Sequence, residues 1–260
     1  MEIFFFVLGM VAGIASGMFG IGGGVVIVPA LTILAGLSIT NAVGTSLAAL
    51  LMPVSILAVI QYYRAGKLKI WVAAPVAVGL IGGGIIGAEL ALSLPTQLLQ
   101  QLYGFFLLYA GWRFAEPRKW LAEIRKTAPP PAPIPEQNVQ VAWWILLVLG
   151  IGAGVLSGMF GIGGGIVIVP ALVTFLKFDQ KLAVGTSLGA LLFPVGLGAV
   201  ISYYNEGAIE ILTAVLVAAG LVVGAFAGAR VALQLPEKTI KRLYGLFLFA
   251  VALKFIFLPS

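Results

Sequence analysis

The sequence SGMFGIGGGVVIVPAL at residues 16–31 returns almost unchanged as SGMFGIGGGIVIVPAL at residues 157–172. The two stretches differ only at Val25 and Ile166, and 141 residues separate equivalent positions. Such self-similarity at a fixed distance is the mark of an internal repeat. The stretch therefore indicates that the chain consists of two copies of one structural unit.

The same offset of 141 residues holds far beyond this stretch. It relates the motif AVGTSL at 42–47 to an identical motif at 183–188, and Pro53 to Pro194. Between the copies, residues 116–140 have a different composition, with several charges and then five prolines from Pro129 to Pro135, which favour an extended linker. We therefore predict a first repeat at 1–115, a solvated linker at 116–140 and a second repeat at 141–260.

Composition and charge spacing predict a protein that lies in a lipid bilayer. Hydrophobic residues make up 61% of the 260 positions and charged residues only 9%, whereas soluble domains average about 25% charged. No charge occurs between Glu2 and Arg64, a length that could cross a ~30 Å hydrocarbon core about three times as helix. Backbone groups in lipid must be paired within the segment, so we predict an all-α polytopic membrane protein.

The net charge and the missing residue types exclude several functions. The charge of +6 comes mostly from Lys and Arg in short loops, where they set membrane topology, so we expect no nucleic-acid partner. The chain has no Cys and no His, which excludes disulfides, thiolate chemistry and imidazole catalysis. We therefore expect no cofactor, no metal site and no enzymatic activity.

Each copy is predicted to contain about five transmembrane segments. In the first copy a helix at about 3–18 ends at a glycine cluster, because each glycine destabilises a helix by about 1 kcal/mol. The expected segments of this copy are 3–18, a short helix at 25–36, and spans at 41–63, 70–92 and 96–114. Pro53 and Pro194 are expected to kink the third element of each copy. Whether the glycine-broken first pair crosses the membrane or re-enters on the same side stays open.

Loop charges predict that the two copies have opposite orientations. The loop after the third element carries Arg64, Lys67 and Lys69 in the first copy, but Glu206 and Glu210 in the second. Basic loops lie on the cytoplasmic side, so corresponding loops lie on opposite sides of the membrane. With the linker inside, both termini are expected on the extracytoplasmic side. The copies are therefore inverted-topology repeats.

The glycine breaks are the candidate substrate site. Inverted-repeat transporters bind substrate near the midplane, where broken helices meet, and a helix N-terminus attracts anions through unpaired N–H groups. The GTS triplets of the AVGTSL motifs add hydroxyl donors. We expect no charged side chain near the midplane of the membrane, so a site there would bind through dipoles, hydroxyls and amides. Pure packing remains the competing interpretation for these residues. The candidate substrate-binding residues are Ser16, Gly20, Gly22, Gly23, Gly24, Gly44, Thr45, Ser46, Ser157, Gly161, Gly163, Gly164, Gly165, Gly185, Thr186 and Ser187.

The doubled SGMFGIGGG stretch, followed each time by AVGTSL, resembles the TauE/SafE family of membrane permeases. The resemblance covers both copies and omits only the linker. It implies a transporter in the inner membrane of a prokaryote, with a small sulfur-containing anion, sulfite or an organosulfonate, as its partner besides the lipid bilayer. Some related anion transporters rely on cysteines within the membrane. This chain has no cysteine, so a thiol-based mechanism is not available to it.

Other functions stay open at this point. The chain could instead be an uptake permease or a channel for another small anion. A membrane enzyme is disfavoured because no His, Cys or midplane carboxylate is available, and a scaffold would leave the inverted duplication unexplained. The sequence does not decide between a monomer and a homo-oligomer.

Overall fold

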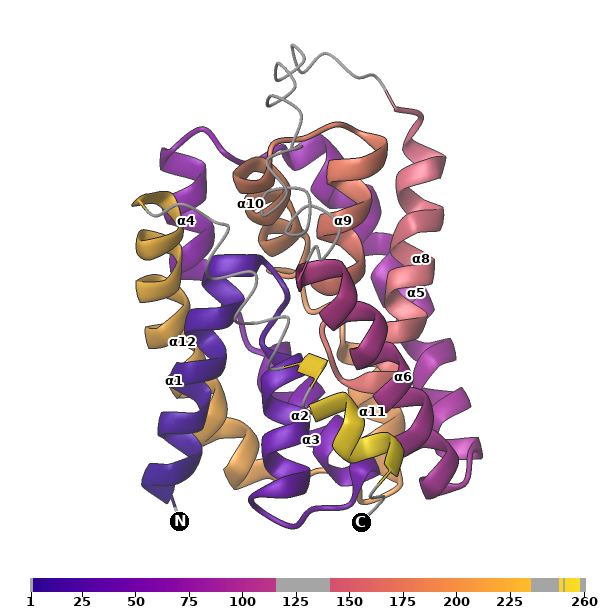
Figure 1. The fold of residues 1–260 in the computed structure, drawn as a ribbon. Coiled ribbons are helices and arrows are strands. Elements are labelled where there is room, and N and C mark those ends of the chain that lie inside the picture. The colour runs from indigo at the N-terminus through magenta and orange to yellow at the C-terminus, as the bar shows by residue number, and fades with distance from the viewer. Residues whose placement is uncertain (1, 116–140, 235–247, 250, 258–260) are drawn as a thin grey trace, which may run out of the picture. The chain divides into compact units, whose positions relative to one another are not determined.

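The computed structural model describes residues 2–115, 141–234, 248–249 and 251–257, and over these residues it contains helices and no strands (Figure 1). The all-helical prediction is therefore confirmed for the described part of the chain, and the predicted linker at 116–140 lies outside it. The labelled helices are α1 (Glu2–Phe19), α2 (Gly24–Ile33), α3 (Ile39–Leu51), α4 (Ile56–Arg64), α5 (Ile70–Ser93), α6 (Thr96–Ala115), α8 (Trp143–Phe160), α9 (Gly165–Phe175), α10 (Gln180–Ala190), α11 (Leu197–Asn205) and α12 (Ile211–Gln234).

Four of the described helices, α1, α5, α8 and α12, are long and apolar enough to cross a membrane. They contain 18 or 24 residues, which corresponds to about 27 or 36 Å of helix beside a hydrocarbon core of ~30 Å. Helices α3 and α4 supply a fifth candidate span if this pair, bent by 52°, is counted as one. The chain is a multi-pass membrane protein.

Six helices, α2, α3, α4, α9, α10 and α11, are short because breaks at glycine or proline separate them from their neighbours. Helices α2 and α9 have 10 and 11 residues, about 15 to 17 Å, which is roughly half of the hydrocarbon core. Pro53 lies in the gap between α3 and α4, after Met52 in an extended conformation, and Pro194 lies between α10 and α11. Proline lacks an N–H and disfavours helix at the preceding residue. The predicted kinks are confirmed as helix breaks.

The chain divides into two compact units. The first comprises residues 1–94 and 137–234, and the second comprises residues 95–136 and 235–260. Helix α6 belongs to the second unit, where the rings of Tyr103 and Phe255 pack edge to face with their centroids 5.3 Å apart. All the other labelled helices belong to the first unit, which contains the predicted site.

Two helix pairs, α1 with α12 and α5 with α8, form the most extensive contacts of the first unit. In each pair one helix comes from the first copy and the other from the second copy. A Cβ atom at Gly79, Gly83 or Gly87 of α5 would collide with backbone atoms of α8, and the same holds for α12 glycines facing α1. Small residues four apart let membrane helices approach closely. These glycines therefore have a packing role.

The two copies fold alike inside the first unit. The hydroxyl of Tyr62 donates a hydrogen bond to the carbonyl oxygen of Gly17 at 3.0 Å, and the hydroxyl of Tyr203 donates to Gly158 at 3.1 Å. Both tyrosines are fully buried. The sequence repeat is therefore also a repeat of tertiary contacts.

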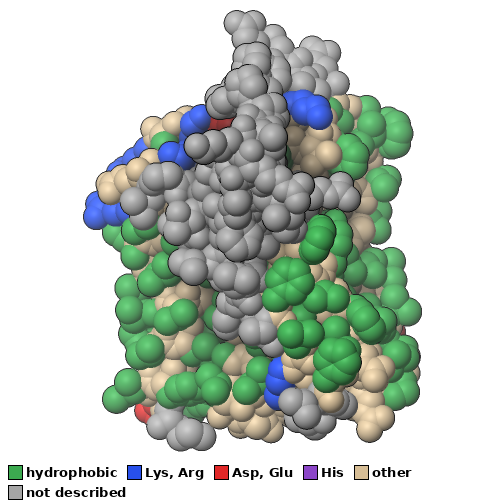
Figure 2. Space-filling view, viewed as in Figure 1, with side chains coloured by type: hydrophobic (Ala, Val, Ile, Leu, Met, Phe, Trp, Pro, Cys, Tyr) green, Lys and Arg blue, Asp and Glu red, His purple; other side chains and the backbone are tan. Residues whose placement is uncertain are grey.

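Large apolar side chains cover the outer surface of the described helices. Ile3, Trp143 and Phe175 are 81%, 67% and 71% exposed. Figure 2 shows hydrophobic side chains over most of the visible described surface, with Lys and Arg gathered mainly near its upper edge. Contiguous apolar surface of this extent is unfavourable in water but suits lipid chains.

Candidate functional site

Each glycine break is built from residues in a left-handed backbone conformation. Three glycines in each break have φ between 70° and 82°: Gly20, Gly22, Gly23, Gly161, Gly163 and Gly164. Glycine adopts this conformation without a steric cost, whereas other residues are strained in it. Helices α2 and α9 begin directly afterwards, at Gly24 and Gly165, so their first N–H groups lie at the breaks.

The two breaks lie against each other. A Cβ atom at Gly24 would collide with the carbonyl oxygen of Gly161, and one at Gly165 would collide with that of Gly20. Gly22 and Gly163 are also neighbours, because a Cβ at Gly22 would lie 3.4 Å from the Cα of Gly163. The structure therefore brings together the glycines that the sequence singled out, at a crossing of the two copies.

The serines of the GTS triplets hold this crossing in place. Ser46 donates a hydrogen bond to the carbonyl oxygen of Gly161 at 2.7 Å, and Ser187 donates to Gly20 at 2.9 Å. All four residues are buried. Each serine thus binds the glycine break of the other copy, a contact that local sequence could not reveal.

The other GTS residues also make contacts between the copies. The Thr45 hydroxyl accepts a hydrogen bond from the backbone N–H of Glu210 at 3.0 Å, and Thr186 accepts one from Lys69 at 3.1 Å. Gly44 packs against Tyr203, and Gly185 packs equivalently in the other copy. The structure does not place these residues on the cavity described next, although the sequence grouped them with the candidate site.

A cavity lies beside the glycine crossing. It is partly enclosed by protein and partly open to its surroundings. Twelve residues line it as six pairs separated by 141 positions: Ser16 and Ser157, Gly22 and Gly163, Leu47 and Leu188, Leu50 and Leu191, Val54 and Val195, and Ser55 and Gly196. Both copies contribute equally, so the cavity lies at their interface.

Three serines line this cavity, and two of them, Ser16 and Ser157, are equivalent in the two copies. Ser16 and Ser157 are 3% and 6% exposed, and within the described chain neither side chain has a hydrogen-bond partner. Both residues lie on the cavity wall, so their hydroxyls are available to a ligand in the cavity. The lining residues include no charged side chain. The cavity therefore offers hydroxyl and backbone donors within apolar walls.

Sequence reasoning predicted four of the lining residues, Ser16, Gly22, Ser157 and Gly163, and missed the other eight. The missed residues follow the GTS triplets, the first three of each copy at intervals of three or four and the last directly after them: Leu47, Leu50, Val54, Ser55, Leu188, Leu191, Val195 and Gly196. This periodicity, repeated in both copies, was the available signal. Lipid-facing leucines show the same periodicity, so it was not specific.

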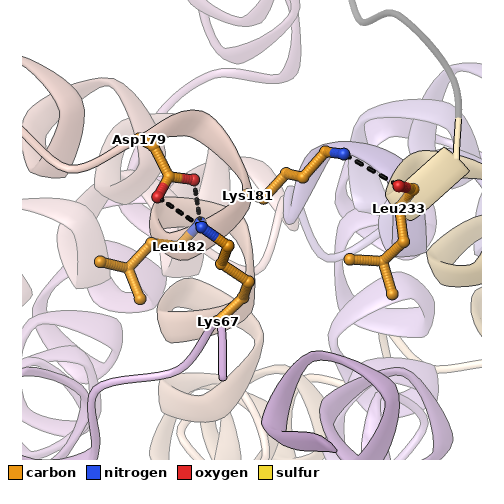
Figure 3. Close-up of polar contacts among 5 residues, drawn as sticks. All are labelled: Lys67, Asp179, Lys181, Leu182 and Leu233. Carbon is orange, nitrogen blue, oxygen red and sulfur yellow. Dashed lines mark hydrogen bonds and ion pairs between the residues drawn. The ribbon is translucent and has the colours of Figure 1, made fainter. Parts of the chain in front are cut away.

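A polar cluster outside the cavity connects loops of the two copies (Figure 3). Lys67, in the loop before α5, forms an ion pair with Asp179 at 2.9 Å, and Asp179 also accepts a hydrogen bond from the N–H of Leu182 as the N-cap of α10. Lys181 donates to the carbonyl oxygen of Leu233 in α12 at 2.9 Å. These contacts place the basic loops of both copies at one end of the unit.

Known proteins similar to this chain are membrane transporters. The model of the family described as "Sulfite exporter TauE/SafE" matches residues 5–255. A probable membrane transporter protein of Bacillus subtilis, YdhB, is 30% identical over 235 residues, covering 88% of this chain and 89% of that protein. A probable membrane transporter protein of Methanocaldococcus jannaschii is 29% identical over 253 residues, covering 90% and 88%. A second one from Bacillus subtilis, YunE, is 28% identical, covering 96% of each chain. No solved structure matches.

Proposed function

Because the chain belongs to the TauE/SafE family of membrane transporters, we propose that it exports a small sulfur-containing anion, sulfite or an organosulfonate, through the cavity between its two copies. The observation that carries this proposal is the cavity itself. It is lined by equivalent residues of both copies, beside two helix breaks, which is where inverted-repeat transporters bind substrate.

The chemistry of the cavity favours a small anion. Helices α2 and α9 begin at the breaks, and a helix N-terminus carries about half a positive charge with unpaired N–H groups. The hydroxyls of Ser16 and Ser157 supply two further donors. None of the described lining residues has a carboxylate, so no side chain among them repels an anion or attracts a cation in its place. The remaining candidate residues at the glycine crossing would shape this site rather than contact the substrate.

Two observations support the inverted arrangement of the copies. Within the first unit, α1 begins at the lower end of the view in Figure 1, whereas the equivalent helix α8 begins at the upper end. The ion pair between Lys67 and Asp179 joins the loop before α5 of one copy to the loop before α10 of the other. Loops that occupy different positions in the two copies thus lie at the same end of the unit, as inverted repeats require.

This arrangement gives a topology. The basic loops are cytoplasmic by the positive-inside rule, so the linker at 116–140 is cytoplasmic and both termini are extracytoplasmic. We assign the protein to the inner membrane of a prokaryotic cell. The short helices α2 and α9 each span about half of the hydrocarbon core, which favours re-entrant segments over full crossings.

The membrane potential suffices to drive export. Each negative charge that leaves a cell with a negative interior gains about 2.3 kcal/mol per 100 mV. The cavity lining has no titratable side chain through which flux could be coupled to protons. Export therefore follows the voltage and the outward substrate gradient.

Flux measurements with purified protein in liposomes test this proposal. The liposomes are loaded with radiolabelled sulfite or methanesulfonate, and potassium with valinomycin sets the voltage. Efflux should exceed that of protein-free liposomes and accelerate as the interior becomes more negative, without a pH or sodium gradient. An uptake permease would instead require an imposed ion gradient, and a channel for another anion would pass chloride as readily. No flux of either sulfur anion would overturn the proposal.

A further inference from the structure

One pair of cavity residues breaks the equivalence of the two copies. Five of the six pairs that line the cavity are identical in residue type, and the sixth pairs Ser55 with Gly196. Ser55 lies directly before α4 and Gly196 directly before α11. The wall of the cavity therefore has one hydroxyl in the first copy that the second copy lacks.

The difference is confined to the side chain. Ser55 has φ −85° and ψ −2°, and Gly196 has φ −85° and ψ −1°, so the two backbones are the same. A Cβ at Gly196 would lie 3.9 Å from both the Cδ2 atom and the carbonyl oxygen of Leu47, which is ordinary contact. Serine fits at either position, and glycine is not required at 196 by its conformation.

The hydroxyl of Ser55 can turn to a ligand. Ser55 is 4% exposed and donates a hydrogen bond to the carbonyl oxygen of Leu188 at 3.4 Å. This distance is long for a bond between oxygen atoms, which are usually 2.5–3.0 Å apart, so the contact is weak. An anion in the cavity would offer a shorter and stronger, charge-assisted bond.

Inverted repeats give this asymmetry a consequence for transport. The cycle moves one repeat against the other around a fixed site, so the inward-open and outward-open states exchange the roles of the two copies. If every lining residue were identical in both copies, an anion would meet the same groups from either side of the membrane. A hydroxyl in one copy alone removes this equivalence.

We propose that Ser55 makes the affinity for the transported anion different on the two faces of the membrane, an inference that rests on the proposed function of this cavity. Without a voltage or a gradient, thermodynamics requires equal Vmax/KM in the two directions, so the asymmetry appears as unequal KM values balanced by unequal maximal rates. One charge-assisted hydrogen bond predicts KM values that differ by about tenfold or more.

Exchanging the two residues tests the proposal. Initial rates of radiolabelled methanesulfonate entry are measured in right-side-out and inside-out membrane vesicles, with the voltage clamped at zero. Four proteins are compared: the unaltered chain, Ser55→Gly, Gly196→Ser, and the double variant with both changes. Ser55→Gly leaves glycine at both positions, so neither copy has a hydroxyl there. Gly196→Ser leaves serine at both positions, so both copies have one.

Each single variant should bring the ratio of the two KM values close to one, and the double variant should invert the ratio of the unaltered chain. A purely structural role for Ser55 would lower activity without inverting this ratio. An unchanged ratio in the double variant, or a ratio of one in the unaltered chain, would overturn the proposal. If Ser55→Gly fails to fold, Gly196→Ser, which keeps Ser55, still decides it, because a KM ratio unchanged from that of the unaltered chain would overturn the proposal. Absence of flux in all four proteins, with either methanesulfonate or sulfite, would instead defeat the proposed function.

Discussion

Removing the serine hydroxyls that bind the glycine breaks should destabilise the protein by a predictable amount. Ser46→Ala leaves the buried carbonyl oxygen of Gly161 without the bond that it accepts at 2.7 Å, and Ser187→Ala does the same to Gly20 at 2.9 Å. Interhelical hydrogen bonds in membrane proteins contribute about 0.6 kcal/mol on average and up to about 1.7. A buried acceptor left unpaired adds to this, so we expect a loss of about 1–2 kcal/mol for each variant.

Thermal unfolding in detergent measures this loss. For a chain of this size 1 kcal/mol shifts the Tm by about 2–4 °C, so each variant should unfold about 2–8 °C lower. Ser93→Ala is the matched control, because its hydroxyl bonds only to Leu90, three residues away on an exposed surface. The control should shift the Tm by less than 2 °C. If Ser46→Ala and Ser187→Ala are as stable as the control, or differ strongly from each other, the reciprocal bracing of the breaks is wrong.

The remaining predictions concern the cavity, the crossing and the topology. Ser16→Ala combined with Ser157→Ala should raise the KM for anion efflux about fivefold or more while leaving the Tm within 2 °C, because neither hydroxyl has a hydrogen-bond partner among the described residues; a lower Tm with an unchanged KM would contradict a role in binding. Gly24→Ala should prevent folded protein from accumulating, because its Cβ meets a carbonyl oxygen, whereas Gly152→Ala, with open space around it, should not; equal yields would refute the close crossing. Reporters at the N-terminus, in the linker at 116–140 and at the C-terminus should report outside, inside and outside, and a cytoplasmic C-terminus would exclude inverted repeats.

The sequence alone predicted the features that depend on local backbone chemistry. Consecutive glycines must interrupt a helix, and Pro53 must end one, so the breaks in the fold were predictable. Repetition added long-range information, because an offset of 141 residues identifies equivalent positions without a structure. The glycine spacing of α5 is likewise typical of closely packed membrane helices, and the structure shows this packing against α8.

The partner of each polar group could not be predicted. Ser46 and Gly161 are 115 residues apart, and nothing near Ser46 indicates that its hydroxyl crosses to the other copy. Thr45, its neighbour in sequence, lies on a different face of the same helix and accepts a bond from Glu210 instead. The apolar wall was equally hidden, because Leu50 differs from lipid-facing leucines only in what the tertiary fold places beside it.

The absence of cysteine from the chain permits a direct test of whether the anion passes through this cavity. Ser16→Cys places one thiol on the cavity wall, and Ser93→Cys places one on an exposed surface as a control. Both proteins are reconstituted and treated with a small anionic methanethiosulfonate reagent, with or without methanesulfonate, before efflux is measured. Labelling at residue 16 should abolish efflux, and methanesulfonate should slow this loss, while labelling at residue 93 should leave efflux intact. Full labelling at residue 16 without loss of efflux, or a rate of loss that ignores methanesulfonate, would contradict transport through the cavity.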